Sequence, residues 1–390
     1  MSARDTQVIL PGATLGVLGG GQLGRMFAHA AQAMGYFTAV RDKDGASPAG
    51  LVSHQHVRTG YEDAQGLAEL ARLCAAVTTE FENVPAGSLN KLAESLPVSP
   101  AGSAVAIAQD RAAEKAHFVK CGVPCAPYAV IETAEQLAAV NDALLPGILK
   151  TARMGYDGKG QVRVKTRDEL IKAWDELKQV ACVLEKMLPL AHECSVIVAR
   201  GRNGDIVNLP VQRNLHRDGI LAVTEVYEGN VPAAQAEQAI AAAKSVAIGL
   251  DYVGVLCVEF FVLDNGQLVV NEIAPRPHNS GHYSQNAMDV SQFELQVRCM
   301  TNLPLVQPRQ HSATVMLNLL GDLWFKDGDS AQAPAWDQIL ALPGAHLHLY
   351  GKVDAKPARK MGHLNITAAS PEKARETALK AAEILGIEAF

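Results

Sequence analysis

The sequence lacks the features that would place the chain in a membrane, outside the cell or on a nucleic acid. No stretch of about 18 uninterrupted apolar residues occurs, so no membrane-spanning helix is expected. The polar start is followed by an apolar run that Pro11 and Gly12 interrupt, which is unlike a signal peptide. There is no long basic run and the formal net charge is −6, whereas a nucleic-acid partner favours a basic face. We therefore expect a cytoplasmic protein without a membrane or nucleic-acid partner.

The cysteines do not form a disulfide or zinc framework. Their number, seven, is odd and their spacing is scattered, which favours reduced thiols. Cys121 and Cys125 have no second pair that would complete a zinc site. With 390 residues, the chain is too long for one compact core, so two or three domains are expected.

Apolar periodicity changes along the chain. In the first hundred residues strands alternate with helices, at 14–18, 24–34, 38–40, 65–73 and 75–79, which predicts a doubly wound parallel sheet. A helix is expected over 103–120, a smaller α+β unit follows over 125–188, and the remainder is rich in strands apart from helices at 233–249 and 371–385. The predicted division is 1–108, 109–305 and 306–390.

A hairpin near the middle of the chain carries two acidic residues. Apolar strands over 258–263 and 267–272 flank Asn265-Gly266, a pair that favours a two-residue turn. In that register Glu259 lies directly opposite Glu272, with Cβ atoms roughly 4.5–5.5 Å apart.

The environment of this pair follows from the alternation of side chains along a strand. The face shared with the two glutamates would hold Cys257, Phe261, Leu263, Val270 and Leu268. Two like charges opposed on such a face are unfavourable unless a cation lies between them, and Mg²⁺ prefers carboxylate oxygens. The alternative is that both carboxylates face solvent and that the buried face is the one with Val258, Phe260 and Val262.

Two glycine-rich loops are candidates for phosphate binding. Residues 155–161, Gly-Tyr-Asp-Gly-Lys-Gly-Gln, follow a strand that ends at Lys150 and are interpreted as a flap that covers phosphates, with a plain β-turn as the alternative. Residues 19–24 match G-x-G-x-x-G between a strand and a helix, and Asp42 follows at the spacing of a dinucleotide site. A sugar phosphate would fit this second turn as well as NAD.

The order of these elements resembles the ATP-grasp superfamily: Lys150, the flap, Glu185 to Leu188, Glu259, and then Asn271-Glu272. Within it, the chain is similar to the family of N5-carboxyaminoimidazole ribonucleotide synthetases. The stretches that carry this closer similarity are 18–26, 80–85, 109–111, 155–161, 271–282 and 359–363. The resemblance implies an α/β and α+β protein: an ATP-grasp fold with an N-terminal Rossmann-like (pre-ATP-grasp) domain and a small β-rich C-terminal domain. Met154 and Ala358 depart from the pattern, because the family usually has glycine there.

The resemblance also implies roles for individual residues. Those expected to bind ATP are Arg111, Lys150, Gly155, Tyr156, Asp157, Gly158, Lys159, Gly160, Gln161, Glu185, Lys186, Met187, Leu188, Glu193, His216, Asn271 and Glu272. Those expected to bind aminoimidazole ribonucleotide are Gly21, Gln22, Leu23, Glu80, Arg276, His278, Asn279, Lys352, Arg359 and Lys360. Glu259 and Glu272 are expected to hold Mg²⁺, and catalytic roles are expected for Lys150, Tyr156, Arg276 and His278.

The implied activity is that of a carbon–nitrogen ligase of purine biosynthesis, which carboxylates aminoimidazole ribonucleotide with bicarbonate and ATP through carboxyphosphate. A homodimer is expected from the resemblance alone. The rivals are another ATP-grasp ligase that uses formate or an amino acid, an NAD-dependent oxidoreductase based on residues 19–24, and a nucleotide-binding regulator without turnover. A zinc site at His278 and His282 would need a helix, which Pro275 and Pro277 disfavour.

Overall fold

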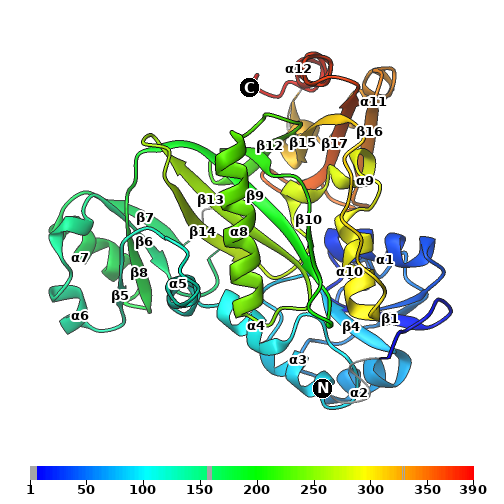
Figure 1. Cartoon of the computed structure of the whole chain (residues 1–390), viewed down its shortest axis with the longest axis horizontal. Helices are drawn as coiled ribbons and strands as arrows, with labels where there is room; N and C mark the ends of the chain where they lie inside the picture. Colours follow the sequence, from blue (N-terminus) through cyan, green and yellow to red (C-terminus); the bar gives the residue numbers. More distant parts are fainter. Residues whose placement is uncertain (1–6, 156–159, 327, 329) are drawn as a thin grey trace.

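The computed structural model describes residues 7–155, 160–326, 328 and 330–390. In these residues the named strands form three sheets, of four, nine and four strands (Figure 1). No helix within the described ranges is both long and apolar enough to cross a membrane.

The first sheet is parallel, as the alternating pattern predicted, and its strand order is β3-β2-β1-β4, in which β3 was not expected from the sequence. Its order reverses beside β1, so the loops after β1 and β4 meet at a switch point, where open α/β sheets bind ligands. These loops hold residues 19–21 and 80–82. The elements are β1 (Thr14–Leu18), α1 (Gln22–Ala33), β2 (Phe37–Arg41), β3 (Gln55–Val57), α2 (Ala64–Leu73), β4 (Ala76–Thr79) and α3 (Ala86–Ala93).

The second sheet forms the centre of the molecule. Its order is β14-β13-β9-β11-β12-β15-β17-β16, and β10 pairs with β9. The strands of the small C-terminal domain expected from residue 306 onward therefore continue the sheet that carries the carboxylate hairpin. The strands are β9 (Leu190–Arg200), β10 (Ile206–Asn208), β11 (Gln212–Arg217), β12 (Ile220–Val226), β13 (Gly254–Leu263), β14 (Leu268–Ala274), β15 (Ala313–Leu320), β16 (Ala345–Leu349) and β17 (Lys360–Ala368).

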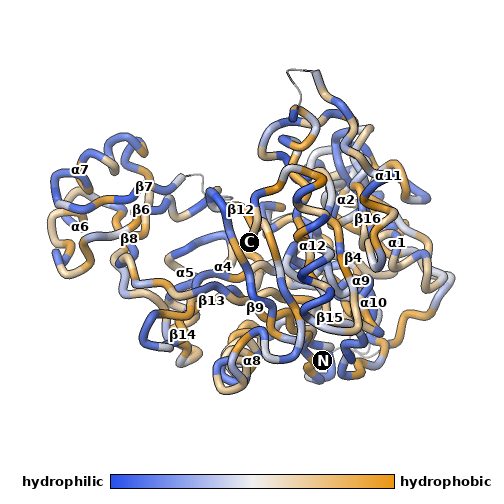
Figure 2. The backbone as a smooth tube through the Cα atoms, turned by 90° about the horizontal axis from the view of Figure 1, so that it is seen from above, coloured by the Kyte–Doolittle hydropathy of each residue, from blue (hydrophilic) through white to orange (hydrophobic). Residues whose placement is uncertain are grey.

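The third sheet is antiparallel and lies in a lobe at one end of the molecule (Figures 1 and 2). It corresponds to the α+β unit expected at 125–188, and the flap connects β6 to β7. The elements are β5 (Tyr128–Ile131), α6 (Ala134–Ala138), η1 (Asp142–Leu144), β6 (Gly147–Thr151), β7 (Gln161–Val164), α7 (Arg167–Glu176) and β8 (Cys182–Lys186).

Helix α8 (Ala233–Gly249) covers the face of the central sheet that points away from the two glutamates. Ala239, Ala243 and Val246 are buried there in one cluster with Val258 and Phe260. The alanines allow the helix to approach the strands closely, so the apolar core lies on this face. Short helices and the C-terminal helix follow this core: η2 (Asn279–Gly281), α9 (Ser284–Ala287), η3 (Gly321–Phe325), α11 (Trp336–Leu340) and α12 (Pro371–Leu385).

Helix α10 (Gln292–Thr301), which the sequence pattern did not reveal, joins the first sheet to the central sheet. Most of its residues are buried, so it shows no polar face that periodicity could detect. The Gln296 amide donates to Thr78 Oγ1 (2.9 Å) and accepts from the Val255 backbone N–H (2.7 Å).

The helix expected over 103–120 is two helices, α4 (Gly102–Ala108) and α5 (Arg111–Lys120). Asp110 caps α5, because its side chain accepts from the backbone N–H groups of Ala112 (3.0 Å) and Ala113 (3.2 Å). Gln109 donates to the carbonyl oxygens of Glu82 and Val84, both at 2.7 Å. The break therefore places Arg111 in the first turn of a new helix.

The hairpin turn also differs from the prediction. Leu263, not Asp264, pairs with Gln267, which leaves a three-residue loop with Gly266 at φ 80°. A bulge between Glu259 and Phe260 then leaves Asn271 unpaired in the register, so Glu259 and Glu272 face each other as predicted. Because of this bulge, Val270 and Leu268 pair with Phe260 and Val262 on the opposite face from the glutamates.

Met154 and Ala358, the two departures from the family pattern, both have left-handed backbones, with φ of 61° and 60°. A side chain in this region costs roughly 1–2 kcal/mol, which glycine avoids. These positions therefore have the conformation for which glycine is favoured.

Replacing Ala358 by glycine should raise the free energy of unfolding by roughly 0.5–1 kcal/mol, because the relief of backbone strain exceeds the added chain entropy. The matched control is Ala241→Gly, also at an exposed alanine but inside α8. The free energy of unfolding of this control should fall by about 1 kcal/mol, because glycine is unfavourable inside a helix. Urea unfolding followed by circular dichroism measures both, and two shifts of the same sign would contradict the interpretation.

Candidate active site

A cleft of about 1200 Å³ lies among the central sheet, the flap-bearing lobe, the first sheet and the C-terminal strands. Most residues singled out from the sequence line it, although they come from all three sheets. Those that do are Gln22, Leu23, Glu80, Arg111, Lys150, Gly155, Gln161, Glu185, Lys186, Met187, Leu188, Glu193, His216, Glu259, Asn271, Glu272, Arg276, His278, Asn279, Lys352, Arg359 and Lys360.

A few of the predicted residues are not among those that line the cleft. Gly21 and Gly160 do not line it. Tyr156, Asp157, Gly158 and Lys159 lie outside the described residues, so their roles stay predictions.

The two glutamates of the hairpin face each other inside the cleft. Burial, followed by the facing Glu272, raises the pKa of Glu259 to about 7. His278 Nε2 lies 3.0 Å from Glu259 Oε1, and Arg111 Nη1 lies 3.1 Å from Glu272 Oε2. Each carboxylate therefore faces a nitrogen group, and neither is directed into the helix-covered core.

The donor atoms around this pair suit a hard divalent cation. The Asn271 side-chain oxygen, at the bulge between the glutamates and the turn, is buried and has no hydrogen-bond partner among the described residues. Together with the two carboxylates it offers only oxygen, the ligand that such cations prefer. The residues present thus fit the ion that the resemblance implies.

A second charged group lies at the lobe side of the cleft. The carboxylate of Glu185, on β8, is 3.2 Å from Lys150 Nζ and 3.3 Å from Lys115 Nζ. Burial alone would raise the pKa of Glu185, but the two lysines outweigh it and the pKa is lowered. Lys150, on β6, is thereby held at the edge of the cleft by its ionised partner.

Glu193, on β9, and His216, on β11, form an ion pair on the floor of the cleft. Burial acts to lower the pKa of His216, but hydrogen bonding to Glu193 and the nearby glutamates outweigh it, so the pKa is raised. The neighbouring strands therefore place this pair close to the Glu259 carboxylate.

The first glycine loop holds a carboxylate of the protein itself, and its role in binding the ribonucleotide stays a prediction. Glu80 Oε1 and Oε2 accept the backbone N–H groups of Gly21 (2.9 Å) and Gly24 (3.1 Å), so the start of α1 already binds a carboxylate of the protein. A Cβ atom on Gly19 or Gly21 would lie 2.5–2.6 Å from the Glu80 side chain. The glycines are thus explained by the close approach of Glu80, and a phosphate would have to displace it.

Sequence reasoning missed several groups that hold these side chains. Glu82 forms an ion pair with Arg276, and Glu114 accepts the Ile273 backbone N–H at 2.8 Å. Glu114 and Lys115 lie one turn after Arg111, a helical spacing that could have revealed that they share its side of α5.

The loop after β14 fixes His278. Its backbone N–H donates to Gln292 Oε1 (2.8 Å), and Gln292 Nε2 lies 3.0 Å from His282 Nδ1. The Ser280 hydroxyl lies 3.0 Å from His278 Nδ1. Because residues 279–281 form one 3₁₀ turn, the two histidines do not form a helical metal pair.

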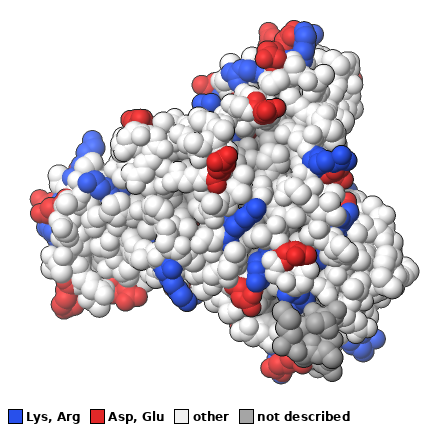
Figure 3. Space-filling model, in the orientation of Figure 1, with Lys and Arg blue, Asp and Glu red and all other residues white. Residues whose placement is uncertain are grey.

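The C-terminal strands add a basic rim to the cleft. Lys352 Nζ donates to the Lys360 carbonyl oxygen (2.6 Å), and Arg359 Nη1 donates to the Asp354 carbonyl oxygen (2.7 Å). Elsewhere, on the face shown in Figure 3, basic and acidic side chains are interspersed.

Comparisons with known proteins cover nearly the whole chain. Three family models match: the ribonucleotide synthetase preATP-grasp domain over residues 12–109, the ATP-grasp domain over 116–293, and the phosphoribosylaminoimidazole carboxylase C-terminal domain over 314–377. A relative from Brucella melitensis, an N5-carboxyaminoimidazole ribonucleotide synthase, is 43% identical over 363 residues, which is 92% of this chain and 98% of the relative. The predicted fold class is thereby confirmed.

Solved structures agree with this assignment. The ADP complex of an N5-carboxyaminoimidazole ribonucleotide synthetase superposes with a TM-score of 0.89 at 39% identity, over 98% of this chain and 99% of that one. An Aspergillus clavatus N5-carboxyaminoimidazole synthase, in complex with ADP and 5-aminoimidazole ribonucleotide, superposes with a TM-score of 0.86 at 30% identity, over 96% and 98%.

The pKa of Glu114 predicts a pH dependence of stability. Burial, followed by Glu272, raises this pKa from 4.5 to about 8. The folded chain then holds the proton more tightly than the unfolded chain, so the associated stability is present below about pH 4.5 and is lost as the pH rises through about 8. Glu114→Gln removes the titration, so the variant should gain stability relative to the native chain over this range.

Urea unfolding from about pH 5 to about pH 9 tests this difference. Glu94→Gln is the control, because Glu94 is exposed and pairs with Lys91 at the surface. If the free energies of unfolding of the native chain and Glu114→Gln differed by the same amount at every pH in this range, Glu114 would not titrate as stated.

Proposed function

The chain belongs to the N5-carboxyaminoimidazole ribonucleotide synthase family, and from this premise we propose that it catalyses the ATP-dependent carboxylation of 5-aminoimidazole ribonucleotide with bicarbonate. The product is N5-carboxyaminoimidazole ribonucleotide, an intermediate of purine biosynthesis. The observation that carries the proposal is the single cleft in which the Glu259–Glu272 pair and the Lys150 group lie together with Arg276 and His278.

ATP would bind between the lobe and the central sheet. The segment Glu185 to Leu188 would line the adenine, and Glu193 would bind the ribose hydroxyls, as the resemblance implies. Lys150 and Arg111 would neutralise the phosphates, since both are held beside the cleft by carboxylates. Glu185 Oε2 faces two lysines and Oε1 is buried, so adenine contacts would use backbone groups of this segment.

Glu259 and Glu272 would hold Mg²⁺, with the orphaned oxygen of Asn271 beside them. When bound, the ion would supply positive charge that offsets the negative charge of the triphosphate. Arg111 now contacts Glu272, so its guanidinium would turn from the carboxylate toward a phosphate.

The ribonucleotide would bind on the side of the cleft formed by the first sheet and the C-terminal strands. Arg276, His278 and Asn279 would contact the aminoimidazole or bicarbonate. The phosphate of the ribonucleotide would be neutralised by Lys352, Arg359 and Lys360. Glu82 would orient Arg276, since their ion pair leaves that guanidinium at the cleft wall.

The chemistry needs activation of bicarbonate, which is a poor electrophile. Transfer of the γ-phosphoryl group gives carboxyphosphate and ADP, and the exocyclic amine of the aminoimidazole then attacks the carboxyl carbon, or CO₂ released from it, to give the carbamate and phosphate. This process depends mostly on positioning and charge neutralisation, so the proposed contribution of Lys150 and Arg111 is electrostatic. Closure of the flap predicted at 155–161 would keep water away from carboxyphosphate and so prevent its hydrolysis.

We also propose that the protein works in the cytoplasm as a homodimer, which the resemblance implies. Light scattering of the purified chain should then give twice the monomer mass of 41.5 kDa.

The activity is tested by release of phosphate from ATP with bicarbonate, with and without 5-aminoimidazole ribonucleotide. Formate and amino acids serve as competing acceptors, because other ATP-grasp ligases would use them. Turnover with one of these in place of bicarbonate would overturn the proposal.

Replacing Glu272 by Gln should reduce bicarbonate-dependent ADP formation by about 10³-fold or more, because half of the cation-binding pair loses its charge. The control is Glu225→Gln, a strand glutamate paired with Arg375 and absent from the lining of the cleft. This control should keep native turnover, and undiminished turnover of Glu272→Gln would refute the metal assignment.

A further inference from the structure

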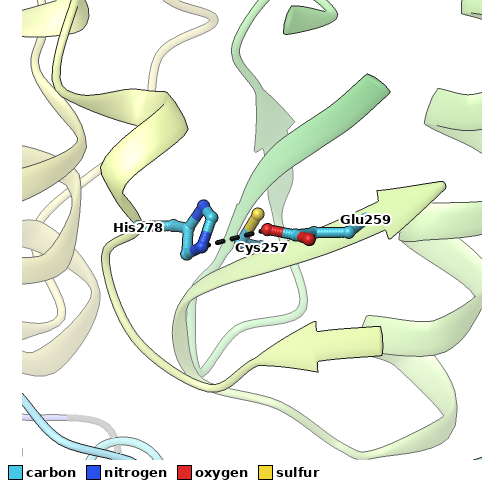
Figure 4. A group of neighbouring side chains, drawn as sticks. All are labelled: Cys257, Glu259 and His278. Carbon is cyan, nitrogen blue, oxygen red and sulfur yellow. Dashed lines mark ion pairs between the residues drawn. The ribbon is translucent and has the colours of Figure 1, made fainter. Parts of the chain in front are cut away.

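A cysteine that the proposed reaction does not use lies beside the carboxylate pair. Cys257 is on β13, two residues before Glu259, so both side chains point to the same face of the strand. The Cys257 sulfur, a Glu259 carboxylate oxygen and a His278 ring nitrogen all lie within 4.8 Å of one another. Figure 4 shows the three side chains converging from β13 and the loop after β14.

We propose that Cys257, Glu259 and His278 form a binding site for Zn²⁺, and that its occupation inhibits the enzyme. Sulfur, nitrogen and carboxylate oxygen are the ligands that zinc takes, whereas the oxygen-only pair of Glu259 and Glu272 suits Mg²⁺. Three protein ligands leave a fourth tetrahedral position for water from the cleft.

The surroundings of the three side chains support zinc coordination. The thiol is fully buried at the edge of an apolar cluster and does not itself line the cleft, whereas its neighbours Glu259 and His278 do, so an ion would reach it past these two side chains. The Ser280 hydroxyl lies 3.9 Å from the thiol and 3.0 Å from His278 Nδ1. The Ser280 backbone N–H also donates to His278 Nδ1 (3.3 Å), so residue 280 fixes the orientation of the ring.

The proton balance of binding is simple. The Cys257 thiol releases its proton to solvent and binds as the thiolate. Before binding, His278 Nδ1 accepts the Ser280 backbone N–H (3.3 Å), so the ring proton lies on Nε2, which faces Glu259. On binding, zinc takes Nε2 and the ring proton moves to Nδ1, at the cost of the hydrogen bond from the Ser280 N–H. Zinc keeps its oxidation state, and one proton is released for each ion bound.

Inhibition follows because the two metal sites share Glu259. Zinc bound to Cys257 and His278 withdraws Glu259 from the carboxylate pair and His278 from the substrate side of the cleft. This consequence rests on the proposed function, whereas the binding of zinc does not.

Binding is tested first, on the full chain without nucleotide after treatment with a chelator. Co²⁺, the spectroscopic probe for zinc, should bind at one ion per chain with a sulfur-to-cobalt charge-transfer band in the near ultraviolet, and Zn²⁺ should displace it. Cys257→Ser should lose the band and weaken binding of Zn²⁺ by roughly tenfold or more. Cys257→Ala serves the same purpose if the serine variant does not fold.

The control is Cys194→Ser. Cys194 is also a buried strand cysteine, next to β13 on β9, but it lies in the apolar cluster under α8 on the opposite face. Its replacement should leave the band unchanged. Absence of one-to-one binding by the native chain, a band that survives in Cys257→Ser, or a band lost in Cys194→Ser would each overturn the proposal.

Inhibition is tested by adding Zn²⁺ at saturating Mg-ATP, bicarbonate and 5-aminoimidazole ribonucleotide. The native enzyme should be inhibited, while Cys257→Ser should keep activity and resist zinc by roughly the factor by which binding is weakened. If zinc inhibited the native enzyme and Cys257→Ser equally, the inhibition would come from a zinc–ATP complex or from zinc at the Glu259–Glu272 pair. That result would refute the inhibitory role of the Cys257 site. If the chain lacked carboxylation activity, the cobalt titration would still decide whether the site binds metal.

Discussion

The organisation of the cleft depends on two like charges that face each other across β13 and β14. At roughly 5 Å, two carboxylates in a protein environment repel by about 3 kcal/mol, which the chain tolerates only with compensation. Arg111 and His278 contact the pair, and the raised pKa of Glu259 allows it to retain a proton. The cleft is therefore arranged around negative charge that a bound cation would neutralise.

Compensation comes from parts of the chain that are far apart in sequence. Arg111 reaches Glu272 across 161 positions, because Asp110 ends one helix and starts the next at that point. Arg276 is held by Glu82 across 194 positions, from the loop after β4. Arg111 and Arg276 thus each have a charged partner on another element, so the mutual placement of the sheets determines the electrostatics around them.

The structure changes the physical explanation of two features that the sequence predicted. The opposition of Glu259 and Glu272 was predicted from a two-residue turn, but a three-residue loop and a compensating bulge at Asn271 produce it. The glycines at 19–21 were interpreted as a phosphate turn, but they admit the Glu80 carboxylate. Turn type and bulges depend on local backbone geometry, and motif spacing does not encode which group fills a helix N-terminus.

The sequence by itself determined the strand and helix pattern of the first sheet, the lobe, the ordered motifs of the ATP-grasp family and most of the residues that meet in the cleft. The helix and strand pattern follows from periodicity, which is a local property, whereas most of the cleft residues were implied by the resemblance to the family. Only the tertiary structure decided the partnership of Glu82 with Arg276, the buried helix α10, the shared nine-stranded sheet and the meeting of Cys257 with His278. Such contacts join distant segments through packing and charge, and no periodicity within one segment specifies its partner in another.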